Sequence, residues 1–141
     1  MTAQRPHPIT ERPLDAPLLT FDLASLLTQI KREAAWHKGM RNSMTLHKGQ
    51  GLHVVLVALH AGAVMPSHHA DSPISVQVLA GVLTFRTDAQ ALTLGTGQLL
   101  TLQAGILHSV EAVEEAAFLL TLATETAHFV EPEPQAWEER S

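Results

Sequence analysis

The chain contains no cysteine in its 141 residues. This absence excludes disulfide bonds, thiolate metal sites and a cysteine nucleophile. The chain also lacks an excess of positive charge, because its formal net charge at pH 7 is -5. A mildly acidic chain has no electrostatic basis for binding nucleic acid or an anionic membrane surface. We therefore expect neither a nucleic acid nor a membrane as a partner.

Long apolar runs are missing as well. No stretch approaches the roughly 20 apolar residues that a membrane-spanning helix needs. Residues 1–13 are polar and rich in proline, without the apolar centre of a signal peptide. No Ser-His-Asp order, paired-carboxylate spacing or phosphate-binding glycine loop is present. These features predict a single cytoplasmic domain that carries none of those catalytic motifs.

Four regions follow one another along the chain. Residues 1–20 read as an extended, proline-rich arm, and residues 125–141 as a charged tail. Between them, residues 21–39 predict one helix packed on the domain, and residues 40–124 predict a barrel. The helix, expected over 22–35, has Asp22 as its cap and Gly39 just beyond its end. Its apolar residues recur with helical spacing: Leu23, Leu26, Leu27, Ile30 and Ala34.

From residue 41 onward the sequence changes to short strands and turns. The segments are rich in Val, Leu, Ile and Thr and are bounded by Gly, Pro or Asp, as strands usually are. We expect strands at 42–47, 52–60, 74–79, 82–86, 91–94, 99–102, 108–110 and 117–123. No helical pattern separates them, which argues against a parallel sheet. The pattern predicts an all-β sandwich or barrel.

Two stretches each combine a strand with a histidine. The first, residues 62–81, runs GAVMPSHHADSPISVQVLAG, and the second, residues 97–108, runs GQLLTLQAGILH. If the two units pack in one small barrel, His68 and His108 lie close together. This expected pairing is the strongest functional signal in the chain.

The first stretch resembles the first motif of the cupins, which are small jelly-roll barrels. That motif places a Gly, then His-x-His, then Glu and a final Gly at set spacings. Gly62, His68 and Gly81 match it. Ala70 stands at the position of the second His, and Ile74 at that of the Glu, counted back from Gly81.

The second stretch resembles the second cupin motif. Gly97, Gly105 and His108 match, whereas Gln103 replaces a Pro and Ala112 replaces an Asn. The resemblance spans about residues 40–124. It implies an all-β fold, the double-stranded β-helix or jelly roll, here with one N-terminal helix.

The resemblance also implies a place for a metal. Metal-bearing cupins hold Mn, Fe, Ni, Zn or Cu with two His and a Glu from the first motif and one His from the second. Only His68 and His108 remain of that set, so a third ligand is needed. His69 is the first candidate, although neighbours in a strand point to opposite faces. Gln77 and His60 are the other two candidates.

Strand 74–79 has two alternative orientations. In one, Ile74, Val76 and Val78 face the interior and the polar residues face solvent. In the other, Ser75 and Gln77 line the barrel beside His68 and His108 and contact a ligand. The alternation of the sequence leaves both open.

Three functions fit these residues. The first is a domain that binds a small molecule in the barrel with a degenerate histidine metal site, in which Met65 and Phe85 are possible lining residues. The second is a metal-dependent enzyme, similar to cupin dioxygenases or isomerases, with His68 and His108 as ligands to Mn, Fe, Ni or Zn. The third is a non-catalytic dimeric scaffold. We expect a homodimer under all three.

Overall fold

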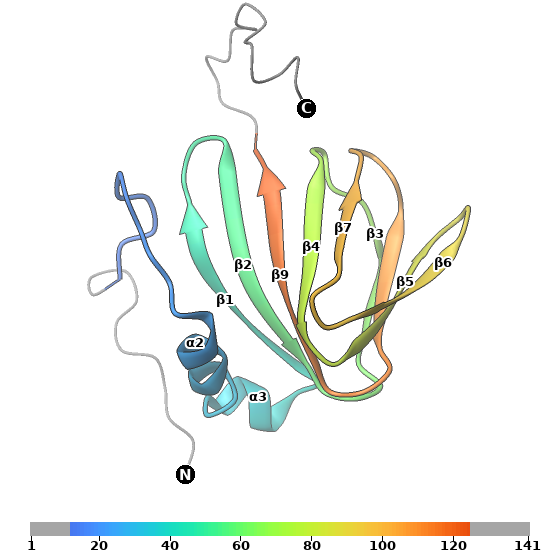
Figure 1. Cartoon of the computed structure of the whole chain (residues 1–141), viewed down its shortest axis with the longest axis horizontal. Helices are drawn as coiled ribbons and strands as arrows, with labels where there is room; N and C mark the ends of the chain where they lie inside the picture. Colours follow the sequence, from blue (N-terminus) through green and yellow to red (C-terminus); the bar gives the residue numbers. More distant parts are fainter. Residues whose placement is uncertain (1–11, 125–141) are drawn as a thin grey trace, which may run out of the picture.

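The computed structural model describes residues 12–124, which form two antiparallel sheets with helices on the outside (Figure 1). The predicted all-β double-stranded β-helix is confirmed. Most of the predicted arm, residues 1–11, and the whole predicted tail, 125–141, lie outside the described residues. No helix between residues 12 and 124 has the length and apolar character that crossing a bilayer requires.

The sheets have five and four strands, ordered β1-β2-β9-β4-β7 and β3-β8-β5-β6. The helices are α2 (Leu23–Ile30) and α3 (Ala34–Lys38). The strands are β1 (Arg41–Lys48), β2 (Leu52–Leu59), β3 (Val64–His68), β4 (Ile74–Ala80), β5 (Val82–Thr87), β6 (Ala91–Gly95), β7 (Leu99–Leu102), β8 (His108–Ala112) and β9 (Ala116–Ala123).

Alternation along β2 separates two apolar cores. Val57 and Leu59 point between the two sheets, into the core that also contains Phe118. Leu56 and Ala58 point the other way, into a smaller core beneath the helices. Successive side chains of a strand face opposite sides, so one strand serves both cores. Ile30 of α2 and Trp36 of α3 share the smaller core with Leu56 and Ala58.

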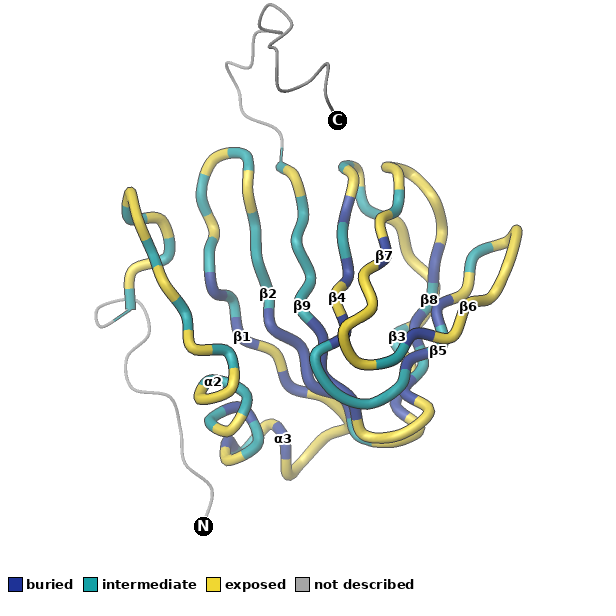
Figure 2. The backbone as a smooth tube through the Cα atoms, in the orientation of Figure 1, coloured by how far each residue is buried: buried dark blue, intermediate teal, exposed yellow. Residues whose placement is uncertain are grey.

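The interior core is tightest at the end where β4 turns into β5. Figure 2 shows buried stretches of strand near this end, whereas the opposite strand ends are mostly intermediate or exposed. Among interior residues, Leu59 and Leu83 are fully buried, whereas Val55, Leu120 and Leu122 are only partly so. We call this less tightly packed end, which carries His68 and His108, the barrel mouth.

The prediction of one helix over 22–35 is wrong, because the chain breaks into α2 and α3. Asn42 of β1 explains the break: its Nδ2 donates to Ile30 O at 3.0 Å and to Glu33 Oε1 at 2.8 Å. Asn42 and Glu33 are both buried. This contact holds the chain in a turn after Ile30, so Ala34 begins α3 instead of continuing the apolar stripe of α2.

The start of α2 agrees with the prediction. Asp22 is the N-cap, and its two carboxylate oxygens accept from Ser25 N and Ser25 Oγ at 3.3 and 3.0 Å. The Ser25 backbone and side-chain hydrogen bonds hold the pKa of Asp22 below its ordinary value. Gly39 follows α3 in extended backbone, so it ends the helix without the left-handed turn that glycine often supplies.

Strand β3 was not expected from the sequence. It contains Pro66, which has no N–H to donate, and most of it is exposed. Its place resolves the difficulty: β3 is an edge strand of the four-stranded sheet, with an irregular register between Met65 and His68. Proline is tolerated at edges and bulges.

Gly81 makes the tight turn between β4 and β5. Its φ is +79°, and a Cβ built there would collide with Glu115 O and lie 2.7 Å from Ala116 Cα. Glycine alone avoids both the strained backbone and the collision. The turn brings β4 and β5 into different sheets and closes the tight end of the barrel.

Candidate functional site

The two histidines singled out by the motifs meet at the barrel mouth. His68 ends β3 and pairs with His108, which begins β8. Their ring centroids lie 4.4 Å apart, with the planes tilted by 56°. His108 is only 4% exposed, whereas His68 is open to solvent. The predicted juxtaposition of these two side chains is therefore present in the fold.

Both rings are held in the same way. The Nδ1 of His68 lies 2.9 Å from Pro66 O, and the Nδ1 of His108 lies 2.9 Å from Ile106 O. A carbonyl oxygen only accepts, so each Nδ1 carries the hydrogen and donates it. In the neutral ring the Nε2 atom then keeps a lone pair. Two imidazoles with defined orientation thus offer two acceptor nitrogens.

The surroundings of the pair are apolar. Phe85 of β5 stacks on His108, with centroids 5.2 Å apart and planes at 11°. Met65, expected as a lining residue together with Phe85, packs against the interior core. The partly buried side chains on this core are Val55, Met65, Ala70, Leu102, Leu120 and Leu122. An apolar wall with a few oriented polar groups is typical of small-molecule sites.

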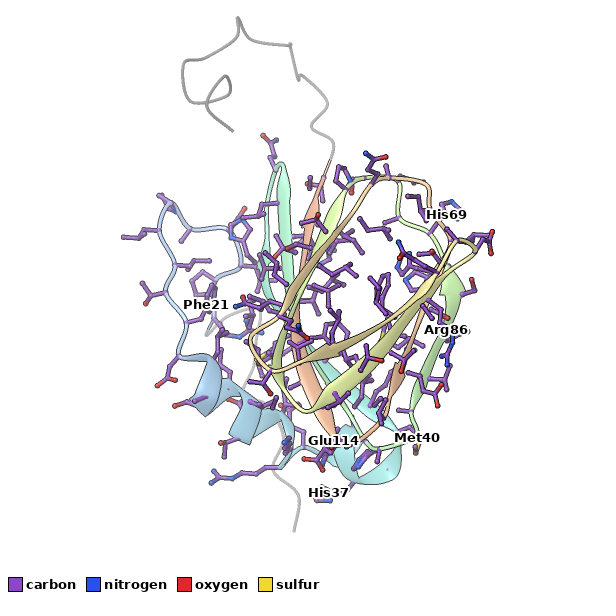
Figure 3. All side chains as sticks on the ribbon, turned by 45° about the vertical axis from the view of Figure 1, so that its right-hand side comes forward. Phe21, His37, Met40, His69, Arg86 and Glu114 are labelled. Atoms are coloured by element: carbon purple, nitrogen blue, oxygen red, sulfur yellow. The ribbon has the colours of Figure 1, made fainter. Side chains whose placement is uncertain are left out.

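His69 does not join the pair. Its side chain is 55% exposed, and its Nε2 lies 3.8 Å from an oxygen of Asp71. Figure 3 shows it at the rim, at the opposite end from Met40 and Glu114. Within residues 12–124, no three His, Asp or Glu side chains gather closely enough to hold a metal ion. The predicted set of His68, His69 and His108 is therefore not assembled.

His60 contacts Trp36 of α3. Its ring stacks on Trp36 at 3.5 Å between centroids, and its Nε2 donates to Trp36 O at 2.8 Å. These contacts fix α3 to the end of β2, because His60 directly follows that strand. A structural role accounts for His60, and it is not the missing ligand.

The orientation of β4 is now settled. Ile74, Val76 and Val78 are buried in the interior core, and Gln77 is exposed on the other face. The alternative that places Ser75 and Gln77 inside the barrel is wrong, so neither reaches a ligand beside the two histidines. β-Branched side chains take the interior because their burial is favourable, whereas an interior Gln would need hydrogen-bond partners.

Ser75 instead lines a separate groove of about 580 Å³ on the other face. There it lies in register with Thr101 of β7 and Thr121 of β9. Leu52 and Gln103 are also among the residues that line this groove. None of its lining residues carries a charge, so the groove has no preference for an ionic ligand.

His53 is a residue of the mouth that the sequence analysis missed. Every second side chain of a strand points to the same side, so His53 shares a face of β2 with Val55 and Val57. It also pairs with Leu122 of β9, and all three neighbours belong to or pack against the interior core, so His53 faces the interior. Its Nε2 is shielded from solvent and has no hydrogen-bond partner within the described chain; Thr124 Oγ1 is in the same condition. A buried polar atom without a partner costs about 1–3 kcal/mol. The alternation of residues 53, 55, 57 and 59 was the available signal.

A tightly bound metal does not fit the donors that are present. Two imidazole nitrogens come from His68 and His108, and no third His or carboxylate joins them within residues 12–124. Stable transition-metal sites of this kind generally use three or more protein ligands. The pair is nevertheless oriented as metal-binding histidines usually are, with one ring nitrogen bonded to a carbonyl.

Comparison with known proteins identifies the fold. No protein-family model matches the chain, and no curated protein matches it. A conserved protein of unknown function from Streptococcus pyogenes is similar in structure, with a TM-score of 0.60 and 27% identity over 64% of this chain and 79% of that one. A cupin superfamily protein from Desulfitobacterium hafniense has a TM-score of 0.59 at 16% identity, covering 60% and 78%.

A third similar structure is an RmlC-like cupin protein from Desulfovibrio desulfuricans, with a TM-score of 0.55 and 23% identity over 59% of this chain and 81% of that one. The shared part is the barrel, built from the two sheets described above. Identities this low establish the architecture and leave the chemistry to this chain's own residues. The described chain therefore has the jelly-roll fold of the cupins.

Proposed function

We propose that this cupin-fold domain binds a small molecule at the barrel mouth, with His68 and His108 as its polar contacts. One observation carries the proposal: each ring donates its Nδ1 hydrogen to a backbone carbonyl, so that Nε2 of the neutral ring keeps a lone pair for a ligand. A ligand with hydrogen-bond donors would use both lone pairs.

The apolar wall supports the same proposal. Phe85 stacks on His108, and partly buried apolar side chains such as Leu120 and Leu122 pack against the interior core that contains Phe85. Contact with such a wall favours a ligand that buries apolar area, at roughly 25 cal/mol per Å². The histidines then provide orientation and selectivity.

A metal-dependent enzyme is the second candidate. The carbonyl bonds at both Nδ1 atoms favour it, because metal-binding histidines are commonly held by a partner at the other ring nitrogen. A degenerate two-histidine site would take Mn, Fe, Ni or Zn weakly, and a substrate or water would have to complete the coordination. Chemistry similar to that of cupin dioxygenases or isomerases would follow only from such a complex.

The test is a comparison of three variants of the full chain. His68→Ala and His108→Gln each remove one of the paired imidazoles, and His69→Ala is the matched control because its side chain lies outside the pair. Each protein, purified without a metal-affinity tag, is analysed for bound metal and screened by thermal shift against small alcohols, phenols and amines.

We expect compounds that stabilise the wild type and His69→Ala but lose at least about tenfold in affinity with either pair variant. Near-stoichiometric metal that both pair variants lose would replace the binding proposal with the enzyme. Hits that bind all four proteins equally would contradict both candidates. The homodimer, the scaffold role and the cytoplasmic location stay predictions, which sedimentation and cell fractionation can test.

A further inference from the structure

Polar atoms lie on both walls of the barrel mouth. His68 and His108 belong to the four-stranded sheet, whereas His53 belongs to the five-stranded sheet. All three are remote from the tight turn at Gly81, because β2 begins, β3 ends and β8 begins at the mouth. The fold therefore places three histidines that are far apart in the sequence at the same end of the barrel.

His53 is a polar residue of this mouth whose Nε2 lacks a partner among the described residues. Its Nε2 is shielded from solvent and bonds to nothing within residues 12–124, and the same is true of Thr124 Oγ1. Thr124 directly follows β9 and donates its N–H to Gly51 O at 3.0 Å, so it adjoins the start of β2. Buried polar groups are normally satisfied, and an exception at a candidate site indicates a partner that the described residues do not supply.

We propose that His53 is the third polar contact of the ligand, on the wall opposite His68 and His108. This inference rests on the proposed binding function. The three histidines do not gather around a single ion, so one metal cannot satisfy them all. A molecule that reaches both walls can, with one end at the histidine pair and the other at His53.

The chemistry of the two walls defines the class of ligand. The end at the pair is a donor, such as a hydroxyl or an amine, since both Nε2 atoms accept there. Leu122, which pairs with His53, and the stacked Phe85 require an apolar body. Facing sheets pack about 10 Å apart, which leaves room for roughly one ring. The ligand is thus a ring-sized molecule with a polar group at each end.

Two probes test this assignment. 4-Hydroxybenzyl alcohol carries a hydroxyl at each end of one ring, and 4-ethylphenol has nearly the same shape with one of them replaced by a methyl group. Binding is followed through the imidazole nitrogen signals of the full-length protein in NMR titrations. We expect the wild type to bind the two-ended probe about five- to tenfold more tightly, the difference that one satisfied hydrogen bond makes.

His53→Leu removes the contact and keeps an apolar side chain of similar bulk, while His53→Gln keeps a polar group if the first variant folds poorly. We expect the preference between the probes to fall to twofold or less in His53→Leu and to persist in the control His37→Ala, which alters an exposed helix residue. We also expect His53→Leu to melt no lower than the wild type, because it removes a polar group that has no partner.

The outcomes separate the inference from the proposed function. If both probes shift the His68 and His108 signals but bind equally well to the wild type, the role of His53 is refuted and the binding site stands. If His53→Leu and His53→Gln both unfold, His53 is structural and the inference is wrong. If neither probe shifts the signals of the pair, the proposed site and the inference fail together.

Discussion

His68 and His108 face each other across the β3–β8 ladder with ring centroids 4.4 Å apart, although they belong to separate sequence motifs. The pairing depends on β3, because that strand carries His68 along the edge of the sheet to the first residue of β8. A carbonyl two residues earlier in the chain holds each ring. The geometry therefore comes from the backbone and does not need a bound ligand.

This geometry predicts the tautomer of both rings. In the neutral form, His68 and His108 should carry their hydrogen on Nδ1, the less common tautomer in free histidine. Long-range ¹H–¹⁵N NMR spectra of the unliganded protein at pH 8 distinguish a protonated from an unprotonated Nε2. The exposed His37 is the internal control and should show the ordinary mixture. A protonated Nε2 in either ring of the pair would refute the carbonyl bonds as the orienting contacts.

Asn42 should be essential for the position of the helices. Asn42→Leu removes the donor shared by Ile30 O and Glu33 Oε1, and leaves buried acceptors without that partner. We expect a loss of about 1–3 kcal/mol in the free energy of unfolding, measured by urea denaturation. Gln77→Leu, on an exposed position of the same sheet, is the control and should change stability by less than about 0.5 kcal/mol. Equal effects of the two variants would argue against the Asn42 contact.

Gly81→Ala should destabilise the barrel more than Gly97→Ala. Both glycines have positive φ, +79° and +87°, but only at Gly81 would a Cβ meet backbone atoms; at Gly97 no atom lies within 4 Å. Backbone strain alone costs more than about 1 kcal/mol, and the collision adds to it. Thermal unfolding of the two variants measures the difference. Similar melting temperatures would mean that the turn yields to the added methyl group.

The Asp22 cap should make α2 sensitive to acid. Hydrogen bonds from Ser25 lower the pKa of Asp22 from its ordinary value of 3.8. Asp22 of the unfolded chain therefore binds a proton more readily than Asp22 of the folded chain. The ionised cap stabilises the fold at pH values above the ordinary pKa. This stabilisation is lost as the pH falls through the lower pKa of the folded chain. We therefore expect the melting temperatures of the wild type and Asp22→Ala, measured between pH 2 and pH 6, to become equal at the acidic end of this range. The side chain of Asp22→Asn still caps the helix but does not titrate. The change of stability with pH that comes from protonation of Asp22 should therefore be absent in this variant.

Local sequence patterns predicted most of the strands, and the elements that were predicted wrongly have physical explanations. Turn glycines and β-branched runs marked eight of the strands, and the two motifs identified His68 and His108. Strand β3 was missed because Pro66 and an exposed surface remove the usual strand signals. The helix break was missed because it depends on Asn42, whose side chain reaches the helices only in the folded chain.

The site was less predictable than the fold. Gln77 could not be assigned a face from the alternation of its own strand, since the answer depends on which side the second sheet covers. His53 carried no motif, and only the pairing of β2 with β9 brings it to the mouth. His69 was a candidate third ligand beside His68, yet it lies just beyond the end of β3, with its Nε2 3.8 Å from an oxygen of Asp71.

The order of the five-stranded sheet also bears on how the protein is made. Strand β9 is the last of the strands in residues 12–124, but it lies between β2 and β4 and pairs with both along most of its length. Until it emerges from the ribosome, at about 5–20 residues per second, β2 and β4 each have an unpaired edge. A nascent chain that stalls before residue 116 would expose the unpaired edges of β2 and β4, to which other chains can bind. The speed of translation up to residue 123 is therefore expected to influence how much of the protein escapes aggregation.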